Sequence, residues 1–259
     1  LDVDRMDYLV RDAHHTGVPY GTIDHGRLVR ELAFIDGQLV LDEGNVQTAE
    51  SLLIARALMN PTVYNHHVAR ISKSMLRRAT ERLLAGTDTS AWELRRMDDH
   101  DLDAALRGAD ATREMARRLA HRDLYKRAVW AEMDDVPGRL IEAESDEIRD
   151  IEAGIAEEAG VDPEGVIVDV PPRPEMQETT SRVVVGGEIR ALDEQSALVE
   201  ALRAANREQW RLGVYAPESL TEPVGHAAER VLGLDTDGRL ISERRGRYVP
   251  LDEFEDRTS

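Results

Sequence analysis

The sequence predicts a mainly α-helical protein with small β additions. Residues 46–59 and 62–84 carry apolar side chains at the three- and four-residue spacing of amphipathic helices. Short apolar runs flank Asp36-Gly37 and Gly186-Gly187, as is typical of β-hairpins with two-residue turns. A proline-rich stretch, residues 171–174, predicts a stiff extended linker between two strands in the last third of the chain.

The length and composition exclude several classes of protein. The chain has 259 residues, enough for one or two domains with a sizeable core. It has no cysteine, which excludes a disulfide framework and a thiolate metal site. No apolar run is long enough to span a membrane, and no signal peptide is visible. We therefore expect a cytoplasmic protein with no membrane partner.

The chain is strongly acidic. Its net charge of −18 argues against a nucleic-acid surface over most of its length. The basic residues are almost all arginine, since lysine occurs only at Lys73 and Lys126. Abundant Asp and Glu, scarce lysine and few aromatic residues indicate a halophilic protein. At molar salt the Debye length is only about 3 Å, so the repulsion between the acidic side chains is largely screened. An acidic interaction surface is the alternative.

Residues 1–17 predict a helix with a chemically varied face. At about 100° per residue, polar side chains of this face fall within an arc of roughly 120°. They are Asp4, Arg5, Tyr8, Arg11, Asp12 and His15. The apolar residues lie on the other side. Such a face could hold a cation through a carboxylate and phosphates through arginine and tyrosine. A solvated helix face is the alternative, although such a face is usually rich in Glu and Lys, and this arc has neither.

A hairpin and two long helices follow. Residues 32–41 predict a hairpin around the Asp36-Gly37 turn. Asn45 can cap a helix over residues 46–59, which Asn60-Pro61 breaks. A second helix is expected from about residue 62 to residue 84.

More helices are predicted in the middle of the chain. Ser90 to Glu93 form a capping box that opens a short helix, and residues 97–102 cap another. Helices are expected to continue to about Met133. Residues 139–160 are helical in pattern and highly charged, which indicates a solvated face.

The last third predicts mixed structure. The order is a strand at 166–170, a hairpin at 181–192, a helix at 196–211 and a strand at 212–217. A helix at 223–232 and a hairpin around Asp237-Gly238 are expected in the tail. We therefore predict domains at 1–160, 161–220 and 221–259, the second being a small α+β subdomain.

The string DVDRMDYLVRDAHHTGV and the following YGTIDHGRLVREL resemble the HD-domain metal-dependent phosphohydrolases. The similarity is greatest to the deoxynucleoside triphosphate triphosphohydrolase-like branch, where D-V/I-D-R/K-x-D-Y-x-x-R-D opens a helix lining the active site. Residues 122–126 resemble the family's R-x-L-Y/F-K signature. The resemblance covers most of residues 1–217. It implies an HD-type helical bundle followed by a small α+β subdomain.

The resemblance assigns a metal role to Asp4, as the last ligand of a catalytic divalent ion (Mg, Mn, Fe, Ni or Zn). The family's other ligands, a His and an adjacent His-Asp pair, lie upstream of this motif and are absent here. His100-Asp101 is far downstream, in a charged turn. Because the chain also lacks an initial Met, we expect it to be the C-terminal part of a longer protein. The adjacent pairs His14-His15 and His66-His67 point about 100° apart on helices and would chelate one ion poorly.

The resemblance also assigns substrate contacts. Arg5, Tyr8 and Arg56 match phosphate-facing residues, Asp12 matches a residue facing the sugar, and Tyr64 matches one packing near the sugar or base. His15 is a further candidate for the pocket wall. From the pattern alone, Arg56 is typical of a surface arginine and Tyr64 of a half-buried residue at the edge of a core.

Two functions are compatible with these residues. The first is a metal-dependent phosphohydrolase acting on nucleotides (dNTP-like) or related phosphate esters, forming homo-oligomers as its relatives do. The second is a non-catalytic regulatory or scaffold module with an HD-like fold, which the chain by itself fits because a single carboxylate cannot hold a catalytic metal. The substrate-facing residues all keep types compatible with the family, which favours an enzyme truncated here over a degenerate one.

Overall fold

The computed structural model describes residues 3–174 and 181–234. Helices dominate and the strands form two small sheets, so the predicted fold class is confirmed. Two compact units divide the chain. Unit 1 combines Leu1–Arg70 with Pro172–Trp210, and unit 2 combines Ile71–Pro171 with Arg211–Ser259.

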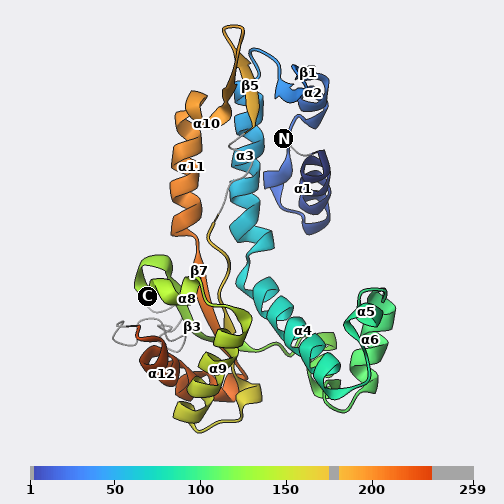
Figure 1. Cartoon of the computed structure of the whole chain (residues 1–259), viewed down its shortest axis with the longest axis vertical. Coiled ribbons are helices and arrows are strands. Elements are labelled where there is room, and N and C mark those ends of the chain that lie inside the picture. The colour runs from blue at the N-terminus through green and yellow to red at the C-terminus, as the bar shows by residue number, and fades with distance from the viewer. Residues whose placement is uncertain (1–2, 175–180, 235–259) are drawn as a thin grey trace, which may run out of the picture. The chain divides into compact units, whose positions relative to one another are not determined.

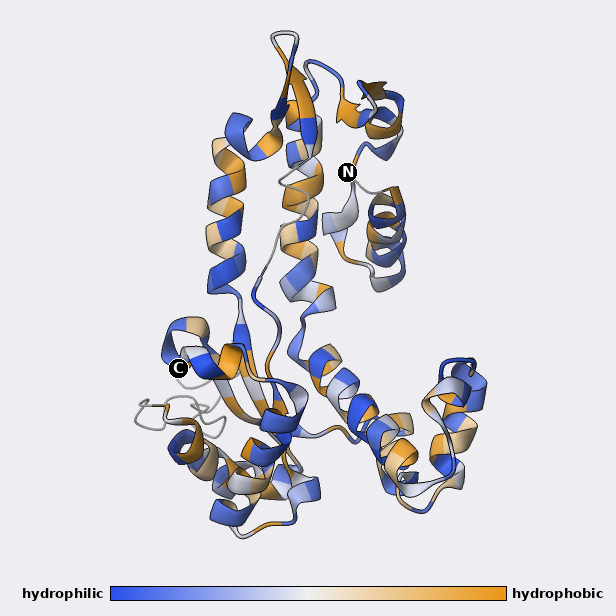
Figure 2. Cartoon of the chain, viewed as in Figure 1, coloured by the Kyte–Doolittle hydropathy of each residue, from blue (hydrophilic) through white to orange (hydrophobic). Residues whose placement is uncertain are grey.

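Unit 1 is built on helix α3 (Val46–Met59), which packs against α1 (Val3–Thr16) and α11 (Ala197–Glu208). Figure 1 shows α3 between these two helices, and Figure 2 shows hydrophobic and hydrophilic residues alternating along α3 and α11. The remaining elements of unit 1 are α2 (His25–Arg30), α10 (Leu192–Gln195), the 3-10 turn Pro19–Gly21 and the π-helix Asn60–Tyr64. The core between the helices contains fully buried side chains such as Leu9, Leu53 and Met59.

The sheet of unit 1 joins the two predicted hairpins. Its strands are β1 (Leu32–Ile35), β2 (Gln38–Leu41), β5 (Arg182–Val185) and β6 (Glu188–Ala191), in the order β1-β2-β5-β6. Strands β2 and β5 pair in parallel, with Leu41 opposite Val183. Both turns have the positive φ angles expected of them: 51° and 76° at Asp36 and Gly37, 61° and 79° at Gly186 and Gly187.

Unit 2 holds a three-stranded antiparallel sheet covered by helices. The strands are β3 (Lys126–Glu132), β4 (Ile167–Asp169) and β7 (Arg211–Ala216), in the order β3-β7-β4. The helices are α4 (His67–Gly86), which begins in unit 1, α5 (Ala91–Leu94), α6 (Asp99–Gly108), α7 (Arg113–Ala120), α8 (Gly138–Ile141), α9 (Ser145–Ala159) and α12 (Thr221–Leu232). Short 3-10 turns occur at Met133–Asp135, Pro163–Gly165 and Glu218–Leu220. Helices α9 and α12 pack on each other beside the sheet, and Ile71, Met75 and Leu83 of α4 join α6 and α7 in a second apolar cluster.

The predicted caps are largely confirmed. Ser90 and Asp98 each form a capping box, at the start of α5 and of α6. Asn45 holds the N-cap position of α3 but makes no capping bond, because its side-chain amide donates to Glu31 and its oxygen accepts from Arg27.

The structure corrects three expectations. Helices do not continue to Met133: Arg122 adopts a left-handed φ of 57° after α7, and the short apolar run after it pairs with β7 as a strand. Helix α4 begins at His67 rather than at residue 62, since residues 60–64 form a π-helix closed by the Asn65 N–H donating to the Asn60 carbonyl at 2.6 Å. The strands expected within 161–220 lie in two different sheets, β5 and β6 in unit 1 and β4 and β7 in unit 2.

The tail helix is confirmed as α12, while the hairpin expected around Asp237-Gly238 lies outside the described residues. Within the described ranges, none of the helices has the length and apolar character needed to cross a membrane.

Candidate functional site

Helix α1 buries one stripe of side chains and divides its polar arc in two. Met6, Leu9 and Ala13 are buried against the core of unit 1. Three members of the polar arc, Arg5, Tyr8 and Asp12, are half-buried, because they lie next to this stripe. The other members, Asp4, Arg11 and His15, are exposed. The predicted six-residue face therefore has two parts. The three half-buried residues form what we call its inner edge, and the three exposed residues form its outer edge.

The inner edge of α1 faces the π-helix that comes after α3. The ring of Tyr8 meets the ring of Tyr64 edge-on, with centroids 5.9 Å apart and planes at 87°. Edge-to-face contact at this distance is favourable because the positive ring edge meets the negative ring face. The contact fixes Tyr64 against α1.

The surroundings of the Tyr64 hydroxyl bring two further predicted residues into the same place. Burial raises the pKa of Tyr64, the neighbouring Asp12 raises it further through hydrogen bonding and charge, and Arg56 lowers it. The phenol of Tyr64 is therefore held in its neutral form close to the Asp12 carboxylate. Tyr8, Asp12, Arg56 and Tyr64 consequently form one cluster, which we call the tyrosine–arginine cluster.

The π-helix sets the geometry of this cluster. Arg56 lies in the last turn of α3, and Tyr64 ends the π-helix Asn60–Tyr64. A π turn inserts an extra residue, which rotates the subsequent side chains by about 100° relative to an α-helix. Tyr64 therefore faces a different direction from the one that an unbroken helix would give it.

The described residues do not by themselves fit a metal centre. Asp4 offers one carboxylate in the first turn of α1. No group of three or more His, Asp or Glu side chains within residues 3–174 and 181–234 is arranged to hold an ion. The rings of His66 and His67 lie 4.3 Å apart and belong to no such group.

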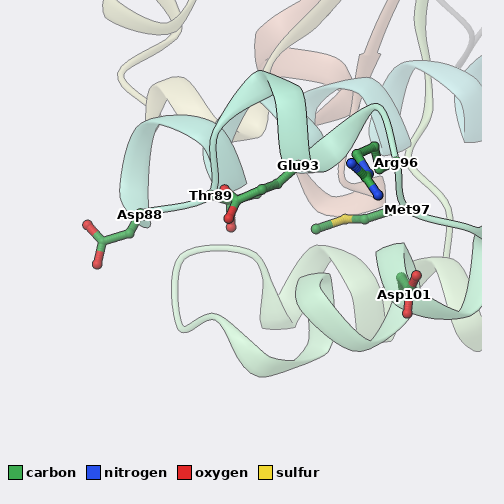
Figure 3. Close-up of a pocket in the computed structure, with 6 residues that line it drawn as sticks. All are labelled: Asp88, Thr89, Glu93, Arg96, Met97 and Asp101. Carbon is green, nitrogen blue, oxygen red and sulfur yellow. The ribbon is translucent and has the colours of Figure 1, made fainter.

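A large open hollow lies elsewhere, in unit 2. Its volume is about 640 Å³, and Asp88, Glu93, Arg96 and Asp101 contribute its charged lining. Figure 3 shows the carboxylates of Asp88 and Asp101 at opposite ends of the hollow. The hollow contains none of the predicted site residues, so its size does not make it the candidate site.

Sequence reasoning missed a charged cluster in unit 2, in which the buried Arg78 and Glu152 pair with each other and with the half-buried Arg149 and Glu81. The helical periodicity of α4 contained a signal for this cluster. Arg78 lies in register with the buried Ile71, Met75 and Ala79 of its helix, a position where a charged residue requires partners.

Comparison with known proteins places the fold. The sequence model of a family described as "HD associated region" matches residues 23–243. A Methanocaldococcus jannaschii protein, MJ1154, is 31% identical over 227 residues, which are 84% of this chain and 49% of that protein. The chain thus spans about half the length of this relative.

Two solved structures share the fold. A protein from Aquifex aeolicus aligns with a TM-score of 0.63 at 25% identity, over 86% of this chain and 56% of that one. A structure named phosphohydrolase (BT4208), from Bacteroides thetaiotaomicron, aligns with a TM-score of 0.57 at 20% identity, over 83% and 61% of the two chains. At that identity, the second likeness is one of fold.

Proposed function

Because this chain belongs to the HD associated region family, we propose that its tyrosine–arginine cluster forms the substrate-binding wall of an HD-type phosphohydrolase acting on nucleotides or related phosphate esters. The observation that carries this proposal is the convergence of Tyr8, Asp12, Arg56 and Tyr64 from α1, α3 and the π-helix. These residues are far apart in the sequence, and a simple solvated helix face would not require their contact. The deoxynucleoside triphosphate is the substrate that the motif resemblance favours.

Each residue of the cluster has chemistry suited to a nucleotide. The Arg56 guanidinium presents a fork of N–H donors that matches phosphate oxygens, and Arg5 on the inner edge of α1 adds a second one. A carboxylate has about four lone-pair sites, so Asp12 can accept from Tyr64 and from a sugar hydroxyl together. The two tyrosine rings would enclose the sugar or base.

Hydrolysis by this site requires more than the described residues supply. We propose Asp4 as one ligand of a divalent metal, with the remaining ligands outside these residues. In this proposal Arg5 and Arg56 neutralise the negative charge on the phosphates, which favours the transition state of phosphoryl transfer.

The test uses the protein encoded by the complete gene, assayed with a panel of deoxy- and ribonucleoside triphosphates in high salt with Mn²⁺ or Mg²⁺. We expect metal-dependent release of phosphate or triphosphate, which Asp4→Ala abolishes without changing the circular dichroism spectrum. Asp7→Ala is the matched control, because Asp7 is exposed on the same helix and pairs with Arg11. Unchanged turnover in Asp4→Ala would exclude the metal role. Nucleotide binding without turnover would favour the non-catalytic module.

A further inference from the structure

Unit 2 contains a small, strongly polar cavity between α4, α9 and β4. Its volume is about 120 Å³, several times the roughly 30 Å³ that a water molecule occupies in the liquid. The polar lining consists of Ser74, Arg77, Arg78, Glu81, Ser145, Arg149 and Glu152. None of these belongs to the tyrosine–arginine cluster, so a role for this cavity is independent of the proposed function.

The cavity carries an excess of positive charge. Glu152 accepts from Arg78 at 2.5 Å and from Arg149 at 2.6 Å, and Arg149 also pairs with Glu81. The lining thus contains three guanidinium groups and only two carboxylates. Arg77 is the third guanidinium, and it forms no ion pair with an acidic side chain among the residues that the structure places. A bound anion would offset this excess of positive charge.

The cavity also holds a buried donor that lacks an acceptor. Arg78 is 8% exposed, and its Nε–H makes no hydrogen bond within the described part of the chain. The Glu81 carboxylate oxygen lies 3.6 Å from this Nε, beyond hydrogen-bonding distance. A buried N–H without an acceptor is costly, because it loses its water without compensation. Burial lowers the pKa of Arg78 and the nearby Arg149 contributes to this, so an added negative charge would stabilise its charged form.

The walls of the cavity are rigidly held. Glu152 is 3% exposed, and its second carboxylate oxygen accepts from the Val168 backbone N–H at 2.8 Å, which ties α9 to β4. Ser74 is 4% exposed and adds a hydroxyl donor from α4. The Glu144–Glu147 capping box already closes the first turn of α9. The positive charge and the hydrogen-bond donors of the cavity therefore come from its side chains rather than from the end of this helix.

We propose that this cavity binds the phosphate group of a small ligand, held by Arg77 and Arg78 with the Ser74 hydroxyl. A tetrahedral oxyanion offers acceptors in several directions, which suits an unsatisfied Nε–H, a nearby arginine fork and a hydroxyl. Two sources share this chemistry, free orthophosphate and the terminal phosphate of a nucleotide whose remainder lies outside the cavity.

Titration calorimetry of the whole protein with sodium phosphate, at constant ionic strength, tests the proposal. We expect Arg77→Ala to weaken phosphate binding at least tenfold. The variant should keep the wild-type melting temperature in the absence of phosphate, since Arg77 is exposed and its loss leaves no buried charge unpaired. Arg107→Ala, which removes an exposed arginine on α6 paired with Asp103, is the control and should bind phosphate like the wild type.

Two further arms make the outcome decisive. Arg56→Ala separates this site from the tyrosine–arginine cluster and should leave binding to the cavity unchanged. A parallel titration with dATP in the Arg56→Ala background identifies the source, because tighter binding than phosphate that Arg77→Ala also weakens would indicate a nucleotide. Absence of phosphate and dATP binding, equal affinity in Arg77→Ala, or loss of binding in Arg56→Ala alone would overturn the proposal.

Discussion

The ring of Tyr8 packs edge-on against the ring of Tyr64, 5.9 Å between centroids and at 87°. This contact joins the first helix of the chain to a π-helix more than fifty residues later. It matters because the Tyr64 hydroxyl also meets Asp12, and Arg56 lies close enough to influence its pKa. The four side chains thus form one cluster, and mutation can probe its environment.

Replacing Tyr64 with Phe should change the response of the protein to alkali. The native pKa of Tyr64 is raised above the ordinary value of about 10, so above pH 10 the unfolded state loses its proton first. The stability present below pH 10 is therefore lost as the pH rises toward the native pKa. Tyr64→Phe has no such proton, and its free energy of unfolding should fall less steeply between pH 10 and 11. Urea denaturation at several pH values measures this, and equal slopes for the two proteins would count against the buried environment.

Adding a methyl group at Gly21 should destabilise unit 1. A Cβ there would lie 2.6 Å from the carbonyl oxygen of Leu9 and would also collide with Ala13, and backbone cannot yield as a flexible side chain does. We expect Gly21→Ala to cost about 1–3 kcal/mol, as overpacking does. Gly26→Ala is the control, since its new methyl would meet only side-chain ends, the guanidinium of Arg30 at 3.3 Å and a carboxylate oxygen of Asp24 at 3.8 Å. Chemical denaturation of both variants gives the comparison, and equal midpoints would contradict the close approach of α1 to the 3-10 turn.

Removing Glu152 should be among the most damaging single changes in unit 2. Its carboxylate neutralises Arg78, whose side chain is 10% exposed, and its loss would leave that charge buried. Breaking such a pair costs roughly 3–5 kcal/mol. Glu164→Ala serves for comparison because Glu164 is 66% exposed in its pair with Arg82, and exposed pairs contribute about 1 kcal/mol or less. Urea unfolding followed by circular dichroism should separate the two variants clearly. Similar losses of unfolding free energy in the two variants would contradict the large contribution that we assign to the buried Arg78–Glu152 pair.

Salt should stabilise the protein if its acidity reflects a saline environment. A net charge of −18 repels itself at low ionic strength, and molar salt reduces the Debye length to about 3 Å. We expect partial unfolding below about 0.1 M KCl, where the Debye length is ~10 Å, and recovery on adding KCl. Thermal melting across a KCl series measures this, and a melting temperature independent of salt would favour an acidic interaction surface instead.

Local signals predicted the local structure well. The two-residue turns, the capping boxes of Ser90 and Asp98 and helix α1 depend on residues close together in the sequence, and each is found in the structure. Strand β3 was missed because a short apolar run does not distinguish strand from helix, and its pairing with β7 joins residues some eighty positions apart.

Some of the residues that the resemblance assigns to substrate contacts lie together in the structure, but their arrangement was not predicted. The helical period placed Tyr8 and Asp12 on one face together with Asp4 and His15, yet only the inner pair meets Tyr64. Which residues of this face are half-buried and which are exposed depends on the elements that pack beside α1. The helical periodicity of the sequence does not identify those elements. The π-helix escaped prediction for a related reason: Asn60-Pro61 indicated an interruption but not how the backbone would cross it.

The central claim is that the tyrosine–arginine cluster binds a substrate phosphate. The most direct test measures the dissociation constant of a non-hydrolysable nucleoside triphosphate for the complete protein with and without Arg56→Ala. Both proteins carry Arg77→Ala, so that the cavity of unit 2 does not contribute. We expect Arg56→Ala to weaken binding on the order of 10- to 100-fold, about 1.4–2.8 kcal/mol, as the loss of a charged hydrogen bond does. Equal affinity in the two proteins would contradict the assignment of this cluster as the substrate site.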